Sequence, residues 1–424
     1  LYLGNYYVKE ITPSEGYLLD KEEHDVVCDY EGDLVAEVSR STTSAEQVIK
    51  QPFQLIKVSD NGDDTEAGLL AGAEFTAYLK SSLSVKADGS YDYNKATPVV
   101  IGENGATTIT SDDKGHAVSI AIPYGTYVVV ESKTPHNMKT IKPFEVKISE
   151  NHPDKPQTWR VFLDREFTAK LRVIKKDSDT KQTVLVPNAE FKIFNIDKNE
   201  YVKQYTTYPS KVEHTSFFTD DDGDLILPEA LKIGNYRIEE VSAPYGYVVN
   251  DKYVNISVDT DTAFETDGDT NDAIITVEYS DAPAVGEMTV EKKGEVLDGF
   301  KGGLLASSYE KEFVYKEGSL AGAKFKVYAA EDIYTADNQK DADGNRIKYY
   351  SKGDLVTTLT TGKDGKATAK KLPLGQYRVV EVEAPYGYVL NPNEQKVTFT
   401  YVDDKTPVIK ESLTFSDDRQ KLDM

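Results

Sequence analysis

The sequence predicts an all-β chain of tandem β-sandwich domains, and three observations lead to this prediction. Tyr, Val, Ile and Thr occur in short blocks in which apolar and polar residues alternate, as in half-buried strands. Asp-Gly, Asn-Gly and Pro signals separate the blocks, for example in TDDDGDL and TGKDGKA. No long segment with a 3.6-residue apolar period competes with them, so helices are not expected.

One phrase recurs along the chain and divides it into repeats. Residues 237–250 read RIEEVSAPYGYVVN, and residues 378–391 read RVVEVEAPYGYVLN. Two weaker copies share the skeleton Gly-x-Tyr-x-x-x-Glu followed by a Pro, and the four glycines, at 4, 125, 234 and 375, are 121, 109 and 141 residues apart. Solenoid units repeat every ~20–50 residues, so intervals of this length indicate duplicated domains.

The length of 424 residues agrees with roughly three domains. We expect full domains at 51–166, 167–284 and 285–424, the last with an insertion, and the C-terminal part of a truncated domain at 1–50. Because LYLGNYYVKE begins inside a copy of the repeat, we expect the chain to be a fragment of a longer protein. The short linkers REFTA and APAVGE predict an elongated rod with restricted bending.

Each full repeat has the same order of predicted strands. It begins with an alternating strand that ends in lysine: FQLIK, LRVIK or MTVEK. A second strand follows a small-residue turn (LAGAEFTAY, VPNAEFKIF or LAGAKFKVY). An Asp-Gly hairpin, the Gly-x-Tyr-x-x-x-Glu strand and a closing strand ending in aspartate complete the repeat. Roughly seven short strands over ~110 residues fit a sandwich of immunoglobulin-like size.

Three ionisable residues lie on apolar strand faces in every full repeat. Side chains two residues apart in a strand share a face, so Lys57 lies with Leu55, and Glu131 with Val129. The complete trios are Lys57, Glu131 and Asp164; Lys175, Glu240 and Asp281; and Lys292, Glu381 and Asp417. Isolated charges would be very costly there, so each trio must pair, change protonation or react. Lys176 and Lys293 are alternative lysines, but their parity directs them toward solvent.

Composition excludes several classes of function. The net charge of −23 disfavours binding to nucleic acid or anionic membranes. A single cysteine, Cys28, excludes an internal disulfide framework. The five histidines lack ligand spacing and TDDDGD does not fill an EF-hand pattern, so neither a metal nor a cofactor is expected. No signal peptide, membrane-spanning segment or sorting tail is recognisable, which says little about location in a fragment. Because of the acidic charge, we expect no direct membrane contact.

The motif GxYxxxExxAPxGY resembles the Cna B-type (SpaA-like) domains of Gram-positive surface adhesins and pilins, and the resemblance covers essentially the whole chain. It implies a spontaneous isopeptide bond between the first-strand lysine and an Asn or Asp of the last strand, assisted by the glutamate. The implied cross-links are Lys57–Asp164, Lys175–Asp281 and Lys292–Asp417, with Glu131, Glu240 and Glu381 as catalytic residues. The chain departs from many relatives in using Asp throughout.

Two of the copies depart further from this pattern. The first full repeat has SKTPHN in place of SAPYGY, and Arg40 of the opening copy aligns with Asp281. The opening copy is therefore not expected to form a bond of this kind. Cys28 suggests the thioester of some related adhesins, but the surrounding motif does not match and a small strand residue is the simpler interpretation.

Two classes of function follow from the resemblance. The first is a structural stalk or pilus shaft, extracellular and cell-wall anchored through sequence outside this chain, with other pilin subunits as partners through sortase. YPSK at 208–211 matches the lysine motif of sortases only loosely. The alternative is an adhesin region that recognises a host extracellular-matrix protein or glycan through insertions at 79–108 and 294–319, the latter expected to be mobile or packed against a neighbour. A turnover enzyme is disfavoured, because the only reactive group would be consumed once by its own chain.

Overall fold

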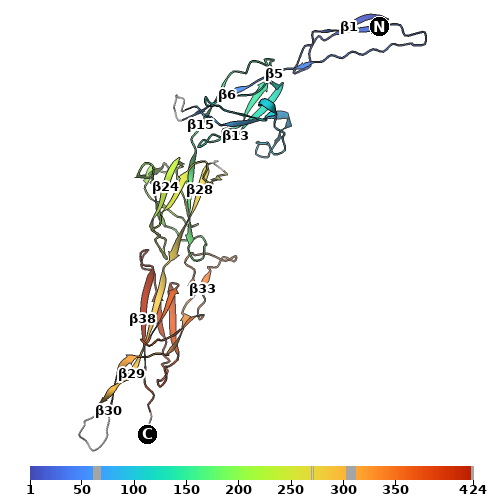
Figure 1. The fold of residues 1–424 in the computed structure, drawn as a ribbon. Helices are drawn as coiled ribbons and strands as arrows, with labels where there is room; N and C mark the ends of the chain where they lie inside the picture. Colours follow the sequence, from blue (N-terminus) through green and yellow to red (C-terminus); the bar gives the residue numbers. More distant parts are fainter. Residues whose placement is uncertain (61–67, 269, 271, 302–311, 422–424) are drawn as a thin grey trace, which may run out of the picture. The chain divides into compact units, whose positions relative to one another are not determined.

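The computed structural model describes residues 1–60, 68–268, 270, 272–301 and 312–421. Strands account for every regular element in these residues except two short 3-10 helices, at Lys80–Ser82 and Glu103–Gly105, so the all-β prediction is confirmed (Figure 1). Contacts divide the chain into two compact units, Leu1–Phe167 and Thr168–Met424. Over the described ranges, no helix has both the length and the apolar character needed to cross a membrane.

The first unit contains a sandwich whose two sheets share one core. One sheet has the order β10 (Thr108–Thr110), β7 (Glu74–Leu79), β13 (Gly125–Lys133) and β14 (Phe144–Ile148). The other has the order β11 (His116–Val118), β6 (Gln54–Ser59) and β15 (Arg160–Asp164). Leu55 of β6, Phe75 of β7 and Val129 of β13 belong to the same buried cluster. The first and last strands, β6 and β15, pair in parallel, so the chain enters and leaves the sandwich along adjacent strands.

The opening copy of the repeat is smaller. β1 (Gly4–Lys9) pairs with β3 (Glu23–Cys28), and β2 (Tyr17–Leu18) pairs with β4 (Gln47–Val48), both antiparallel. The side chains of β1 are mostly exposed, whereas those of the corresponding strand β13 are mostly buried or half-buried.

The second unit contains two sandwiches with the same plan. In the first of these, one sheet has the order β22 (Asp224–Ile226), β16 (Thr168–Asp177), β28 (Ala273–Pro283) and β25 (Tyr247–Val248). Its other sheet has the order β18 (Glu200–Tyr201), β17 (Glu190–Asn195), β24 (Gly234–Ser242) and β26 (Val254–Val258). In the next sandwich, one sheet has the order β30 (Glu312–Ser319), β29 (Val285–Lys301) and β35 (Lys366–Leu372), and β38 (Val408–Asp417) also pairs with β29. The other sheet has the order β34 (Leu355–Thr360), β31 (Lys324–Ala329), β36 (Gly375–Glu383) and β37 (Gln395–Phe399). Again the first and last strands pair in parallel, β16 with β28 and β29 with β38.

The structure departs from the sequence predictions at one linker and one insertion. APAVGE was expected to be a linker, but β28 ends at Pro283 and β29 begins at Val285, so only the buried Ala284 separates the two strands. The insertion at 294–319 is a two-stranded ribbon rather than a loop where it is described, since β29 pairs with β30 from Lys293 to Lys301. Figure 1 shows this ribbon projecting beyond the other strands of its sheet. Residues 302–311 lie outside the described part of the chain.

The recurring phrase has a conformational basis. The glycine of Gly-x-Tyr has a φ of 151° at Gly125, 148° at Gly234 and 146° at Gly375, which disfavours residues with a Cβ. The tyrosine hydroxyl donates a hydrogen bond to the carbonyl four residues earlier in each full repeat, at 2.8, 2.8 and 2.6 Å. This bond resembles the tyrosine corner of other sandwiches and fixes the start of the strand that carries the glutamate.

Candidate cross-linking sites

The three predicted lysines are completely buried. Lys57, Lys175 and Lys292 each have an exposed fraction of 0%. In each sandwich an aromatic residue of the last strand pairs with the lysine: Phe162, Tyr279 or Phe415. The aspartate follows that aromatic residue by two positions, so it lies on the same sheet face, diagonal to the lysine. The parallel pairing of first and last strands therefore brings each lysine to its aspartate.

The structure brings all nine predicted residues together as three trios. Lys57 Nζ lies 2.9 Å from Glu131 Oε1 and also contacts Asp164 Oδ1. Lys175 Nζ lies 2.5 Å from both Glu240 Oε1 and Asp281 Oδ1. Lys292 Nζ lies 2.8 Å from Glu381 Oε2 and contacts Asp417 Oδ1. Every side chain in these trios has an exposed fraction of 0%. The amine and the two carboxyl groups are thus held in contact away from water.

Each glutamate is oriented by a backbone amide ten residues later. Ile141 N–H donates to Glu131 Oε2 at 2.9 Å, and Asn250 N–H donates to Glu240 Oε2 at 2.8 Å. In the third trio, Asn391 N–H donates to Glu381 Oε2 at 3.3 Å. In the second and third sandwiches the asparagine Nδ2 also donates to the carbonyl of Ser280 or Ser416, directly before the aspartate. The loop after the glutamate strand therefore ties the glutamate to the strand that carries the acid.

The lysine is positioned by a glycine that sequence reasoning assigned only to a turn. The Lys57, Lys175 and Lys292 N–H groups donate to the carbonyls of Gly115, Gly223 and Gly365 at 2.7, 2.8 and 2.7 Å. These glycines have φ values of 69°, 78° and 73°. A Cβ on Gly223 would lie 2.2 Å from the Val184 carbonyl oxygen, and one on Gly115 would lie 2.2 Å from the Lys57 carbonyl oxygen. These turns, Asp-Gly in the second and third full repeats and Lys-Gly in the first, thus pack against the lysine backbone.

The surroundings of the trios are apolar and shift the carboxyl pKa values. The lysine Nζ atoms lie 5.8, 5.5 and 5.9 Å from the ring centres of Phe75, Phe191 and Phe325. Burial raises the pKa of Asp164 to about 6 and that of Asp281 to about 8, although the neighbouring lysine opposes the shift in each case. Burial also raises the pKa of Glu381. A neutral acid is therefore favoured at these positions relative to an exposed aspartate or glutamate.

The aspartate oxygens are poorly satisfied as carboxylates. Both Oδ atoms of Asp164 and of Asp281, and Oδ2 of Asp417, are buried without a hydrogen bond of acceptable geometry. The contacts of Asp164 and Asp281 with lysine meet the distance for an ion pair but not the angles of a hydrogen bond. A buried anion with unmet acceptors is unfavourable, so the arrangement suits a reactive or neutral state better than a stable ion pair.

Sequence reasoning missed another buried acid. Asp177 is completely buried two residues after Lys175, and its carboxylate accepts the Tyr247 hydroxyl at 2.7 Å and the Asp179 and Thr180 amides at 2.7 and 2.9 Å. Because Asp177 lies two residues after Lys175 in the same strand, both side chains lie on the same face, and this signal in the sequence predicts its burial. Because its oxygens are satisfied by donors, Asp177 is structural and Tyr247 of the APYGY motif is its partner. The alternative lysine Lys176 lies outside the trio and bonds Thr183 Oγ1 at 3.2 Å.

The expected alignment of Arg40 with Asp281 is wrong. Tyr247 pairs with Pro283, two residues after Asp281, and the corresponding Tyr17 pairs with Val48. The residue two positions before Val48 is Glu46. The opening copy therefore has an acid, not an arginine, at the position that corresponds to Asp281.

These features define a class of tandem β-sandwich proteins in which each full repeat buries one lysine between two carboxyl groups. The model of the SpaA family, described as a prealbumin-like fold domain, matches residues 52–160, 169–272 and 310–412. These matches cover well over half of the chain, so the chain belongs to this family, and the resemblance inferred from the repeat motif is confirmed.

Other similarities are more distant. The trypsin-resistant surface T6 protein of Streptococcus pyogenes serotype M6 is 32% identical over 75 residues, which are 17% of this chain and 14% of that protein. The Bacillus anthracis TIE protein is 18% identical, with 94% of this chain and 54% of that one covered and a TM-score of 0.36. The shaft pilin SpaA of Lactobacillus rhamnosus GG is 18% identical, with 55% and 98% covered and a TM-score of 0.23. The chain thus spans only part of the surface T6 and TIE proteins.

Proposed function

We propose that this chain is a structural stalk or pilus-shaft region of a Gram-positive cell-surface protein, stiffened by an intramolecular isopeptide bond in each full repeat. The proposed domains are 51–166, 167–284 and 285–424, after the partial domain at 1–50. Membership of the SpaA family supports the proposal, as do relatives whose names describe a surface protein and a shaft pilin. The proposal includes an extracellular location, anchoring to the cell wall and assembly with other pilin subunits.

The observation that carries the proposal is the threefold recurrence of a completely buried Lys–Glu–Asp trio. In the proposed reaction, the lysine Nζ attacks the aspartate Cγ, a C–N bond forms and a C–O bond breaks. The ammonium and carboxylate become an amide, and one oxygen leaves with two protons as water. The reaction needs no other reactant, and each site reacts once.

The geometry supplies three contributions to this condensation. The fold holds the amine against the acid, which removes the entropic cost of a bimolecular encounter. Burial favours the neutral acid, as the raised pKa values of Asp164 and Asp281 indicate. The glutamate contacts the amine and is fixed by a backbone amide, so it can accept a proton from the lysine and deliver one to the leaving oxygen.

The position of the bond suits a protein under tension. The chain enters each sandwich along the first strand and leaves along the last, and the proposed bond joins those two adjacent strands near their C-terminal ends. A pulling force would then pass from one strand to the other through the amide. The residues between lysine and aspartate would remain folded, because they lie inside a closed covalent loop.

Intact-mass spectrometry tests the proposal directly. The wild-type chain should weigh less than its sequence by three water molecules, one for each bond. A chain with Glu131, Glu240 and Glu381 all replaced by glutamine should approach the unmodified mass. If the wild-type chain has the unmodified mass, the trios are buried ion pairs and the proposal is wrong.

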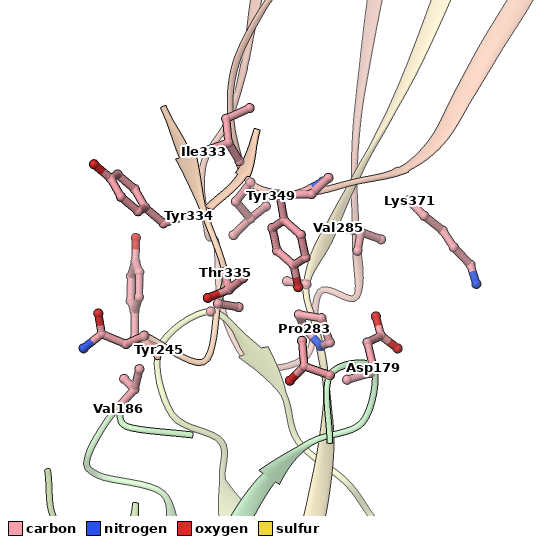
Figure 2. Close-up of a pocket in the computed structure, with 18 of the residues that line it drawn as sticks. Asp179, Val186, Tyr245, Pro283, Val285, Ile333, Tyr334, Thr335, Tyr349 and Lys371 are labelled. Atoms are coloured by element: carbon pink, nitrogen blue, oxygen red, sulfur yellow. The ribbon is translucent and has the colours of Figure 1, made fainter. Parts of the chain in front are cut away.

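One feature favours the alternative of a ligand-binding adhesin region. A pocket of about 770 Å³ lies between the two sandwiches of the second unit. Figure 2 shows Tyr245, Tyr334 and Tyr349 around it, with Asp179 and Lys371 among its polar groups. Tyrosine rings beside polar groups are suited to binding an amphipathic ligand such as a glycan. A glycan array probed with the wild-type chain and with Tyr334→Ala would test this role, and equal signals would argue against it.

A further inference from the structure

One residue of the third sandwich binds both ends of the loop that follows the second glutamate. Asp404 lies between β37 and β38 of the third sandwich. Its carboxylate accepts the Ala243 N–H at 3.2 Å, and its backbone carbonyl accepts the Val249 N–H at 2.9 Å. Asn250, the next residue, donates its own N–H to Glu240 Oε2 at 2.8 Å. Asp404 therefore holds the residue directly before the amide that orients the glutamate.

Tyr401 of the third sandwich makes two further contacts with the same loop, which comprises residues 243–249. Its hydroxyl donates to the Tyr247 carbonyl at 3.1 Å, and its ring centre lies 4.7 Å from that of Tyr245. The loop that follows the second glutamate is thus held at its two ends and near its middle by residues of the neighbouring sandwich.

A separate set of hydrogen bonds fixes the third sandwich against the second. Asp337, which is buried, accepts the Thr180 hydroxyl at 2.8 Å and, through its carbonyl, the Leu185 N–H at 2.8 Å. Gln339 Nε2 donates to the Thr183 carbonyl at 2.6 Å. Because these bonds do not involve the segment between β37 and β38, a substitution in that segment should leave the two sandwiches in contact.

The first full repeat closes the equivalent loop with its own side chains. Thr134 and Thr140 occupy the positions of Ala243 and Val249, three and nine residues after the glutamate. Their hydroxyl groups form a hydrogen bond of 2.7 Å. The two loops have the same length and the same turn, in which a proline carbonyl accepts a backbone N–H at 3.1 Å. Alanine and valine side chains cannot form the hydroxyl bond, so the neighbouring sandwich supplies in the second repeat what the first repeat supplies itself.

We propose that Asp404 is a positioning residue for the second cross-link, so that the Lys175–Asp281 bond forms efficiently only after the third sandwich has folded against the second. The inference rests on the proposed cross-linking, and its reaction is the same loss of water between amine and acid. Holding the 243–249 loop keeps the Asn250 N–H at the glutamate before the reaction begins, so less ordering is needed in the transition state. The second bond would then depend on two sandwiches, and the first on one.

Timed cross-linking of the full chain tests this inference. Wild type and variants are made by cell-free synthesis, samples are denatured in guanidinium chloride at intervals to stop the reaction, and peptide mapping measures each of the three bonds. Asp404→Ala should slow the second bond on the order of tenfold, because the Ala243 N–H loses its acceptor, and should leave the first and third bonds unchanged. Asp404→Asn should react at nearly the wild-type rate, because its amide oxygen can still accept that hydrogen bond.

Two further variants separate positioning from general damage to the interface. Asp403→Ala is the matched control, because the Asp403 carboxylate accepts its hydrogen bonds, of 2.9 and 2.7 Å, from within its own segment. It should not slow the second bond. Adding Ala243→Thr and Val249→Thr to Asp404→Ala should restore the rate, since the two hydroxyl groups can form the bond found in the first repeat.

Three results would overturn the inference: equal rates of the second bond in wild type and Asp404→Ala, equal slowing by Asp403→Ala, or no recovery with the threonine pair. If Asp404→Ala also loses the third bond, the third sandwich has been damaged, and recovery of the second bond by the threonine pair decides the matter. An unmodified wild-type mass would refute the cross-linking itself, whereas these results remove only the role of Asp404. The two failures are therefore distinguishable.

Discussion

Replacing Glu240 by glutamine separates the proposed catalytic role of its carboxyl group from the effect of the buried charges in the second full repeat. Glutamine has nearly the same shape, and its amide oxygen can still accept the Asn250 N–H, which lies 2.8 Å from Glu240 Oε2. It cannot accept a proton from Lys175. Lys175 and Asp281 remain in contact, so the variant should lose the bond without leaving a single unpaired buried charge.

The expected loss of stability follows from the length of the closed loop. A bond from Lys175 to Asp281 encloses about 100 residues, and the chain-entropy model developed for disulfides gives about 5 kcal/mol for a loop of this size. For a domain of this size, a loss of about 5 kcal/mol corresponds to a fall in unfolding temperature on the order of 15–25 °C. Strain in the closed loop would lower this value, so about 5 kcal/mol is the upper figure with which the calorimetric result is compared.

Two measurements on the same sample decide the matter. Intact mass should show one water molecule more in Glu240→Gln than in the wild type, and peptide mapping should place the unreacted pair at Lys175 and Asp281. Calorimetry should show the lower transition. The matched control is Glu239→Gln, because Glu239 points to the other face, where it pairs with Arg237 and Tyr201. If Glu240→Gln reacts as completely as the control, Glu240 is not catalytic and the mechanism proposed here is refuted.

Three further predictions test other parts of the site. Burial raises the pKa of Asp164 to about 6 and that of Asp281 to about 8. Bond formation during refolding should therefore slow above about pH 6 in the first full repeat and above about pH 8 in the second. Before the bond forms, each raised pKa stabilises the folded state at low pH, and this stabilisation is lost as the pH rises through the pKa of the folded state. Timed peptide mapping that gives identical pH profiles would contradict this. Gly223→Ala should slow formation of the second bond and destabilise its sandwich by more than about 1 kcal/mol, because the new Cβ would lie 2.2 Å from the Val184 carbonyl oxygen. Gly246→Ala is the control: a Cβ there has no atom within 4 Å, so this variant measures the cost of a positive φ alone. Replacing residues 296–317 by a short turn should leave a soluble β-rich protein with all three bonds, and aggregation or loss of the third bond would show that the ribbon is part of the fold.

The sequence predicts the fold well because every signal is present several times. The alternating strands, the glycine turns, and the lysine and aspartate at the strand ends occur in the same order in all three full repeats. A strand assignment that is ambiguous in one repeat is therefore supported by the other two. The segment APAVGE and the insertion at 294–319 have no copy of the same sequence in the other repeats, and there the structure differs from the expected linker and loop. β29 continues from Val285 to Lys301 because its first half pairs with β35 and β38 and its second half with β30, a gain that single-strand propensity does not show.

The trios were found by parity and resemblance, but the groups that hold them were not. The Asn250 amide and the Gly223 carbonyl act through the backbone, so side-chain chemistry gives little indication of them. Asp177 was overlooked although it shares the face of Lys175, because the first and third full repeats have Ser59 and Gly294 at that position. A residue that varies between copies does not stand out in a comparison of repeats, even when it is completely buried.

Glu46 shows what alignment of repeats can and cannot supply. Aligning residue types placed Arg40, in the sequence EVSRS, opposite Asp281. The spacing indicates Glu46 instead, because Glu46 follows Glu10 by 36 residues, as Asp417 follows Glu381. The loop between glutamate and acid varies among the copies, so that agreement could not be recognised as meaningful before the pairing of Tyr17 with Val48 was known. Strand register, rather than residue identity, is therefore the property that identifies the acid position.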